Sequence, residues 1–419
     1  MKLTRYKLGE ILNVTRGASL SGEFYATEGE YIRLTCGNFD YQNNCFKENK
    51  SKDNLYYVGD FRSEFLMEEG DIITPLTEQA IGLLGSTAII PESGKYIQSQ
   101  DVAKIVCKED LLDKNFAFYL ISSALVKQQL SAAAQQTKIR HTSPDKIKDC
   151  TVWIPELSEQ KRIGKLLRSI DSKIELNRQI NQNLEAMAKQ LYDYWFVQFD
   201  FPNEEGKPYK SSGGNMVWNE KLKRNIPIGW NNGTLIDIAN ITMGQSPDGT
   251  SYNEIGEGVL FYQGSTDFGM RFPSVRQYTT APSRFAKKGD ILMSVRAPVG
   301  AVNIANNDCC IGRGLSALNS KIGSTTHLYY ILNDLRIAFD QRNAAGTTFG
   351  SITKEDLYNL PIVIPAKEVI SAFDKICSPM FDRQMLLGEE IDTLIKQRDE
   401  LLPLLLNGQV LVNSDLSDD

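Results

Sequence analysis

Residues 7–17 read KLGEILNVTRG and residues 234–244 read TLIDIANITMG, two stretches with the same apolar and polar pattern that both end on glycine. Two further pairs recur in the same order. They are Glu69-Gly70-Asp71-Ile72-Ile73 with Lys288-Gly289-Asp290-Ile291-Leu292, and Val152-Trp153-Ile154-Pro155 with Ile362-Val363-Ile364-Pro365. Subtracting positions gives offsets of 227, 219 and 210 residues. A duplicated unit of about half the chain predicts two related domains that bind two related targets.

The composition is that of an ordinary globular protein. The 419 residues are 42 % hydrophobic and 23 % charged, and this length allows two or three domains. No apolar run approaches the roughly 18 residues of a membrane span, and the N-terminus lacks a signal-peptide core. The seven cysteines include no Cys-x-x-Cys motif, so reduced thiols are expected. These features predict a cytoplasmic protein with no membrane contact.

Net charge gives no general sign of nucleic-acid binding. The chain carries −6, whereas a DNA-binding domain usually has a basic excess. Residues 366–419 hold eleven acidic and five basic residues, while residues 230–365 hold eleven of each. Seven of the eleven bases in 230–365 are arginine, the residue best suited to paired contacts with bases and phosphates. A local basic face is therefore compatible with the sequence.

Each half of the chain reads as a mixed α/β unit. In residues 1–157 and again in 230–365, short apolar runs separated by Gly, Pro and Asn predict strands of about five residues. The runs are 31–34, 71–74, 88–91, 102–107 and 151–155, then 260–263, 290–296, 302–305 and 315–318. Apolar stripes predict one helix in each half, over 115–130 and over 325–339.

A long helix is predicted after each half. Apolar residues alternate steps of three and four over 158–200, where Ser158 is the expected N-cap, and over 366–407 less regularly. Such stripes favour an antiparallel intramolecular coiled coil that places the two halves at opposite ends of a rod. Residues 201–229 would be an irregular, exposed linker, and 408–419 a disordered acidic tail. The predicted class is α+β, a pseudo-twofold repeat of two mixed domains joined by two long helices.

Several motifs resemble those of the specificity subunit of type I restriction–modification enzymes, over nearly the full chain. They are Glu159-Gln160-Lys161-Arg162-Ile163, Trp195-Phe196-Val197, Gly206-Lys207-Pro208-Tyr209-Lys210, Gly229-Trp230, Gly244-Gln245-Ser246-Pro247 and Ser294-Val295-Arg296-Ala297-Pro298-Val299-Gly300. The resemblance implies that 1–157 and 230–365 are target recognition domains, each reading one half of a bipartite double-stranded DNA site. It implies that the helices 158–200 and 366–407 set the gap between the half-sites.

The resemblance also implies partners. Two methyltransferase subunits, which hold S-adenosylmethionine and methylate adenine, would dock on the helices, and motor-nuclease restriction subunits would join them for cleavage. This chain itself would carry no cofactor and no catalytic residue. Because both recognition domains must meet one duplex, their separation should suit a helical repeat of about 34 Å.

Candidate DNA-binding residues in the second half lie in loops and at strand ends. Gln245, Ser246 and Tyr252 lie in a loop bounded by Gly and Pro, Gln263 ends one predicted strand and Arg296 ends another. Gln can pair with adenine through two hydrogen bonds in the major groove, and Arg can contact phosphate. The same residues also fit a polar surface loop or, for Arg296, a structural ion pair.

Candidates in the first half are Arg16, Arg33, Lys138, Arg140 and His141. The last three lie in the stretch Gln136-Thr137-Lys138-Ile139-Arg140-His141, which reads equally well as a solvated basic loop. At an offset of 210, its counterpart Gly346-Thr347-Thr348-Phe349-Gly350-Ser351 contains no base. The two heads are therefore expected to read different sequences.

Catalytic interpretations have little support in the sequence. Neither His141 nor His327 lies near cysteine at metal-ligand spacing, so no metal site is expected. Gly312-Arg313-Gly314 precedes a strand-like run where a dinucleotide fingerprint requires a helix. One other class remains open, a coiled-coil assembly scaffold whose heads bind proteins without DNA contact. A narrower variant keeps DNA reading but serves a modification-only system without a nuclease.

Overall fold

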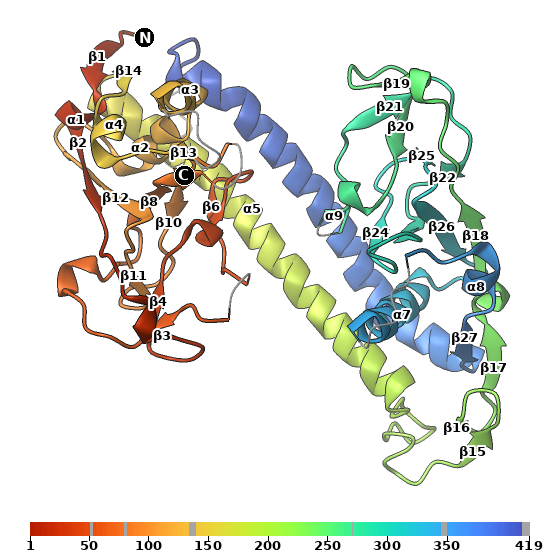
Figure 1. The fold of residues 1–419 in the computed structure, drawn as a ribbon. Coiled ribbons are helices and arrows are strands. Elements are labelled where there is room, and N and C mark those ends of the chain that lie inside the picture. The colour runs from red at the N-terminus through yellow and green to blue at the C-terminus, as the bar shows by residue number, and fades with distance from the viewer. Residues whose placement is uncertain (51–52, 79–81, 134–139, 270, 345–349, 413–419) are drawn as a thin grey trace. The chain divides into compact units, whose positions relative to one another are not determined.

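A computed structural model describes residues 1–50, 53–78, 82–133, 140–269, 271–344 and 350–412. The chain forms two compact units. Unit 1 comprises Met1–Lys173 and Leu394–Asp419, and unit 2 comprises Ile174–Thr393. The two long helices, α5 (Leu157–Tyr192) and α9 (Lys367–Leu406), are each divided between the units (Figure 1). Each unit therefore contains one repeat together with one end of each helix.

Unit 1 is built on a four-stranded antiparallel sheet rich in β-branched residues. In spatial order its strands are β10 (Ala88–Ile89), β8 (Ile72–Pro75), β12 (Val102–Cys107) and β2 (Leu12–Arg16). Ile105 pairs with Ile72 on one side and with Val14 on the other. All three are buried, so this row forms part of the core.

Smaller sheets complete unit 1. One has the order β11 (Tyr96–Ile97), β4 (Tyr31–Arg33), β7 (Tyr56–Tyr57) and β3 (Tyr25–Ala26), with β11 and β4 parallel. The N-terminal strand β1 (Thr4–Lys7) pairs with β14 (Thr151–Ile154), the strand that leads into α5. The short helices α1 (Leu8–Ile11) and α4 (Pro144–Lys148) flank these strands. The chain therefore begins beside the start of its first long helix.

The single helix predicted over 115–130 is wrong, because the structure has two helices there. They are α2 (Lys114–Ile121) and α3 (Ala124–Ala133). At the break, Ser122 Oγ donates to the Phe118 carbonyl (3.1 Å) and Ser123 Oγ to the Leu120 carbonyl (2.6 Å). Serine hydroxyls that bond to local carbonyls compete with the helical ladder, which explains the interruption.

The start of α5 packs closely on the start of α2. Gln160 is buried, donates to the carbonyls of Leu111 (3.1 Å) and Pro155 (2.9 Å), and accepts from the backbone of Asp113 (3.0 Å). A side chain at Gly164 would meet Asp113 and the Phe116 amide at 2.8 Å, so glycine is required there. Ser158 is not the N-cap as predicted, because the helix already begins at Leu157.

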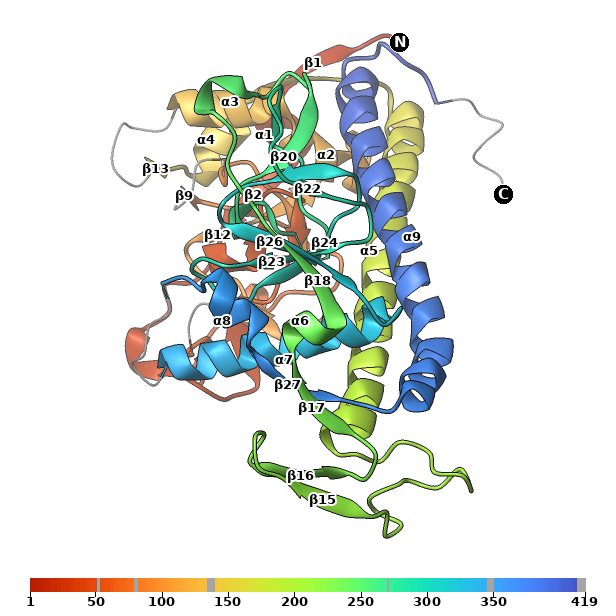
Figure 2. The same ribbon diagram turned by 90° about the vertical axis from the view of Figure 1, so that its right-hand side faces the viewer.

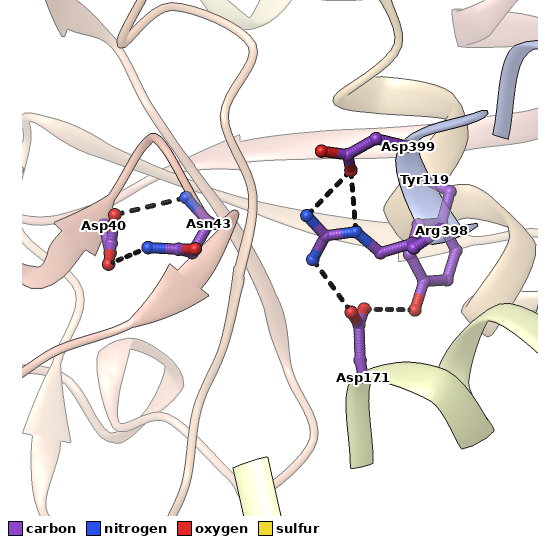
Figure 3. Close-up of polar contacts among 6 residues, drawn as sticks. All are labelled: Asp40, Asn43, Tyr119, Asp171, Arg398 and Asp399. Carbon is purple, nitrogen blue, oxygen red and sulfur yellow. Dashed lines mark hydrogen bonds and ion pairs between the residues drawn. The ribbon is translucent and has the colours of Figure 1, made fainter. Parts of the chain in front are cut away.

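Within unit 1, the two long helices are joined by a buried ionic network (Figure 3). Asp171 of α5 accepts from Arg398 of α9 (3.0 Å) and, through its other oxygen, from the Tyr119 hydroxyl of α2. Arg398 also donates to Asp399 at 2.8 and 2.9 Å. Burial and the adjacent Asp171 carboxylate raise the pKa of Tyr119 well above its usual value. Tyr119 therefore stays a hydrogen-bond donor, and the network ties α2 to both long helices.

Unit 2 repeats the main sheet of unit 1. Its strands are β18 (Ala239–Met243), β26 (Leu315–Ser320), β23 (Ile291–Ser294) and β24 (Val302–Ile304), in the spatial order that corresponds to β2, β12, β8 and β10. Likewise β17 (Asn231–Thr234) pairs with β27 (Pro361–Ile364), as β1 does with β14. The duplication predicted from the sequence is therefore confirmed by the topology.

The second sheet of unit 2 is larger than its counterpart. It contains β19 (Tyr252–Asn253), β21 (Gln277–Thr279), β20 (Val259–Tyr262), β25 (Cys309–Ile311) and β22 (Phe285–Ala286). Only β20 and β25 are parallel, as β4 and β11 are in unit 1. The helices of the repeat are α6 (Leu235–Ile238), α7 (Thr325–Ala344) and α8 (Lys354–Tyr358). Helix α7 is longer than the predicted 325–339.

Helix α7 lies near α5 and α9 in the ribbon (Figure 2). An aromatic core joins these three helices within unit 2. Tyr192 and Phe196, at the end of α5 and in the π-helical turn Asp193–Val197 that follows, pack with Tyr330 of α7 and Phe373 of α9. His327 of α7 lies in the same cluster, with its ring 4.6 Å from that of Phe196. Core packing of rings at these distances holds both helix segments against the repeat.

The connection predicted as an irregular, exposed linker is largely exposed but contains regular structure. It contains the hairpin β15 (Met216–Asn219) and β16 (Arg224–Pro227). Before the hairpin, the ring of Phe201 stacks on Tyr209 (4.6 Å) and on Trp230 (5.1 Å) and is buried. Hairpin pairing and aromatic burial therefore override the Gly, Ser and Pro content that suggested an irregular segment. Of the predicted tail, residues 413–419 lie outside the described part of the chain.

Polar pairs also join α5 to α9 within unit 2. Asn177 donates to Glu390 (2.9 Å), and Gln384 donates to the Asn181 carbonyl (3.2 Å) and to Glu185 (3.1 Å). Asn177, Asn181 and Gln384 are all buried. Later residues of α5 contact earlier residues of α9, so the two helix segments in unit 2 run antiparallel.

The buried His327 should make unit 2 sensitive to acid. Burial lowers the pKa of His327 from 6.5 to about 3, so the folded state keeps it neutral while the unfolded chain binds a proton below pH 6.5. Its contribution to stability is complete above pH 6.5 and is lost as pH falls toward 3. At pH 5 the loss should be about 2 kcal/mol.

Urea unfolding at pH 7 and pH 5, followed by tryptophan fluorescence, measures this loss because Trp195 and Trp230 are buried in the same core. His327→Phe should remove about 2 kcal/mol of the pH-dependent difference seen in the unsubstituted chain. An equal pH dependence in both proteins would contradict the assignment.

Candidate nucleic-acid interface

Five backbone segments of unit 2 meet at the strand ends of its two sheets. We call this set the unit 2 junction, which consists of residues 244–246, 263–264, 295–297, 312–314 and 350–352. The segments are joined by backbone hydrogen bonds of 2.9 to 3.3 Å, namely Gln245 to Ile311, Gly314 to Gln263, Val295 to Gly314, Ile352 to Val295 and Ala297 to Gly350. An isolated β-bridge also pairs Arg296 with Ser351.

Glycines allow the segments of the unit 2 junction to approach so closely. A Cβ on Gly244 would lie 2.2 Å from the Gly312 carbonyl oxygen. A Cβ on Gly312 would lie 2.9 Å from the Gln263 backbone, and one on Gly314 would lie 2.6 Å from its carbonyl. The Gly312-Arg313-Gly314 motif therefore serves backbone contact, which agrees with rejecting it as a dinucleotide fingerprint.

Four of the five residues predicted in the second half lie at this junction. Gln245, Gln263 and Arg296 are exposed, and Ser246 Oγ accepts from the backbone of Arg313 (3.2 Å). Arg313 is also exposed. The fifth, Tyr252, has a local structural role, because its hydroxyl donates to the Pro247 carbonyl (3.0 Å) and its ring stacks on Phe261. DNA contact by any of them stays a prediction.

Unit 1 contains the same construction, the unit 1 junction, formed by residues 16–18, 76–78, 98–101 and 140–142. Ala18 donates to the Gln98 carbonyl, Leu76 to Asp101 and Thr142 to Leu76, at 2.8 to 3.0 Å. The equivalent bonds in unit 2 are Gln245 to Ile311, Val295 to Gly314 and Ile352 to Val295. The residue numbers of equivalent donors in the two units differ by 227, 219 and 210, which are the offsets of the sequence repeat. A Cβ on Gly17 would lie 2.2 Å from the Gln98 carbonyl, as at Gly244.

The side chains of the unit 1 junction differ from those of unit 2. Its strands β9 (Thr77–Glu78) and β13 (Arg140–His141) pair with each other. Glu78 is buried and lies 3.6 Å from the Arg140 guanidinium, and Thr77 bonds to the exposed His141 (3.3 Å). This junction therefore combines carboxylate, imidazole and guanidinium groups, whereas that of unit 2 contains amides and two arginines.

The remaining predicted residues of the first half lie in varied settings. Arg16 is exposed at the junction, where its Nε donates to the Gln100 carbonyl (2.8 Å). Arg33 is buried, stacks on the Tyr25 ring at 3.8 Å and donates to the Asn54 carbonyl (3.2 Å), so it has a structural role. Lys138 lies outside the described residues.

The residue that sequence reasoning missed is Arg313. It was considered only as part of a dinucleotide motif, although a Gly-x-Gly turn between two strands indicates close backbone packing with one side chain at the tip. Over the described part of the chain, no group of His, Cys, Asp and Glu could hold a metal ion. In the same residues, no helix is long and apolar enough to cross a membrane.

Comparison with known proteins gives the family of the chain. The family model described as type I restriction modification DNA specificity domain matches residues 2–186 and 227–382, one segment for each repeat. The matched segments cover most of the sequence. The chain therefore belongs to this family.

Named relatives agree with this assignment. A protein of Methanocaldococcus jannaschii, provisionally named as the specificity subunit of the type I restriction enzyme MjaX, is 29 % identical over 379 residues, 86 % of this chain and 84 % of that protein. The specificity subunit of the type I restriction enzyme HindI of Haemophilus influenzae is 23 % identical over 385 residues, covering 76 % and 81 %. The crystal structure of a type I restriction-modification S subunit from M. genitalium shares the fold, with a TM-score of 0.61 at 16 % identity over 97 % and 96 % of the two chains.

The close approach at Gly244 predicts a strong effect of a single methyl group. Gly244→Ala should destabilise unit 2 by about 1–3 kcal/mol, because the Gly312 carbonyl would have to move. Gly264→Ala is a matched control at the same junction, since its backbone is extended and its Cβ would meet nothing within 4 Å. Thermal unfolding of both variants measures the difference. Equal stability of the two would show that the junction is not tightly packed.

Proposed function

We propose that this chain is the DNA-recognition subunit of a type I restriction–modification complex, and that each unit reads one half of a bipartite target through its junction. The observation that carries the proposal is the repetition of one backbone construction with different exposed side chains, in a chain of the DNA specificity family. Two units that share a backbone but expose different side chains are suited to a target whose two halves differ in sequence.

The chemistry of the junctions is suited to reading bases without catalysis. Gln245, Gln263, Arg296 and Arg313 are exposed, and amide and guanidinium groups of this length reach base edges in the major groove. The backbone beneath them is held by hydrogen bonds between segments, so a contact would order only the side chains. The role of the chain is then to select a site on which other subunits act.

The two long helices would give the complex its spacing. We infer one antiparallel coiled coil along α5 and α9, supported by contacts within each unit, Asp171 with Arg398 in unit 1 and Asn177 with Glu390 in unit 2. In unit 2, Asn177 of α5 meets Glu390 of α9, whereas the later residue Asn181 meets the earlier residue Gln384. The 40 residues of α9 extend about 60 Å at 1.5 Å per residue, enough to separate readers by one or more helical repeats.

The partners in this proposal are two methyltransferase subunits, which would hold S-adenosylmethionine, and motor-nuclease restriction subunits. The names of the relatives, specificity subunits of restriction enzymes, support such a complex. The acidic charge of −6 also indicates that DNA affinity depends on these subunits. A modification-only system would need the same chain without the restriction subunits.

The same net charge favours the second candidate, an assembly scaffold that does not bind DNA. That scaffold would still use the coiled coil and would bind partner subunits through its duplicated units. The two candidates differ in one property, namely whether a complex that contains this chain binds duplex DNA by sequence.

Retention on DNA separates the two candidates. The chain co-expressed with its methyltransferase subunits should hold duplex fragments of the host genome that carry its target at about 150 mM salt, and should release fragments without it. Specific sites are usually bound at least about a thousandfold more tightly than non-specific DNA. Methyltransferase subunits without this chain are the control. Stable assembly of the complex with equal, weak binding of all fragments would favour the scaffold.

A further inference from the structure

Arg313 stands on the most constrained turn of the unit 2 junction. Its backbone N–H donates to Ser246 Oγ (3.2 Å), and the residues on either side bond to neighbouring strands, Gly312 to the Tyr262 carbonyl (2.8 Å) and Gly314 to Gln263 (3.2 Å). A side chain at either glycine would collide with the Gln263 backbone. The Cα of Arg313 is therefore fixed, while its own side chain is exposed.

The guanidinium of Arg313 has no structural role among the contacts that the described residues make. Three arginines of unit 2 are engaged within the protein, Arg271 with Glu185 (2.7 Å), Arg276 with Asp267, and Arg224 with the Phe199 ring. Arg296 is exposed like Arg313, but it does not stand on the glycine turn. An exposed arginine on a rigid turn keeps its planar set of donors available for a ligand. The turn fixes the backbone of Arg313 and leaves the positive charge of its guanidinium unpaired among the described residues.

The surroundings of Arg313 favour purine bases over cytosine. None of the residues 244–246, 263–264, 295–297, 312–314 and 350–352 is acidic, and a carboxylate is the usual acceptor for the cytosine amino group. Arginine fits the O6 and N7 atoms of guanine with two hydrogen bonds, and glutamine fits adenine in the same way. The unit 1 junction differs because it contains Glu78 and Asp101.

Both neighbours of Arg313 are glycines, so no side chain of theirs shields its exposed guanidinium. The planar donors of a guanidinium can bind a base edge or a phosphate, and the binding experiment below distinguishes the two.

We propose that Arg313 is a base-reading residue of unit 2, whose guanidinium binds the O6 and N7 edge of a guanine in the major groove of the target. This assignment rests on the proposed function and names the residue by which one half-site is distinguished. Removing Arg313 should relax the sequence preference at one base pair and leave the other positions unchanged.

The test compares three variants of the full chain, each in complex with the methyltransferase subunits. Arg313→Ala removes the side chain, and Arg313→Lys keeps the charge but cannot bind a guanine with the same planar pair of donors. Lys321→Ala is the matched control, because Lys321 is exposed and follows the far end of β26, the strand that begins just after Arg313. That strand places the two cations about 20 Å apart. Thermal unfolding of each complex confirms that it is folded.

Binding is measured on a pool of duplexes in which each position of the target is varied in turn. The unsubstituted complex should prefer guanine at one position of one half-site by about 5- to 140-fold. Arg313→Ala and Arg313→Lys should both lose most of that preference, and Lys321→Ala should retain it. The salt dependence of binding should be the same for Arg313→Lys as for the unsubstituted chain.

Two results would overturn the assignment. A phosphate contact would appear as uniform weakening by Arg313→Ala at all positions, with a salt slope lower by about one and full recovery in Arg313→Lys. Unchanged binding by both variants would show that Arg313 does not contact DNA. In either case the proposed function stands, whereas an unsubstituted complex without any base preference would remove the proposed function itself.

Discussion

Each unit completes its core with side chains from both long helices, and the rest of the fold depends on this packing. In unit 1, Ile163 and Leu167 of α5 and Leu405 of α9 are buried with the main sheet and α2. In unit 2, Tyr192 of α5 and Phe373 of α9 are buried with α7. A recognition unit that lost either helix segment would expose a large apolar surface. Segments of both long helices are therefore part of the core of each unit.

Duplication kept the backbone of the junctions and changed their side chains. The hydrogen bonds from Leu76 and Val295 occupy equivalent positions, yet the side chains near them differ. They are the exposed His141 and the half-buried Arg140 in one unit, and the exposed Arg296 and Arg313 in the other. A backbone held by glycine and by bonds between strands tolerates such changes, because the varied side chains make few contacts with the core. This arrangement lets specificity diverge while stability is preserved.

The sequence predicted the features that come from periodicity and repetition. The two repeats, nine of the strands and the long helices were found because apolar spacing and recurring motifs are local properties. The break at Ser122 and the ordered linker were missed, because serine hydroxyl bonding and the stacking of Phe201 on Trp230 depend on tertiary contacts. The burial of Arg33 against Tyr25 was missed for the same reason.

Sequence reasoning did not single out Arg313, because its position is defined by the segments around it. The sequence placed Gln245 in a loop and Gln263 and Arg296 at the ends of separate strands, and only the fold brings four chain segments around the Gly312-Arg313-Gly314 turn. The glycines were visible as a motif, but the reason for them depends on the assembled sheets. A Cβ at Gly312 or Gly314 would lie 2.6 to 2.9 Å from the Gln263 backbone. Prediction of a site from sequence fails where the site is made by long-range packing.

The central claim is that the two repeats read two separate parts of one duplex. Mapping methylated adenines in a genome exposed to this chain and its methyltransferase subunits tests that claim most directly. The account predicts two short blocks of specified bases separated by a gap of constant length and free sequence. A single uninterrupted block, or a gap whose length varies from site to site, would contradict it.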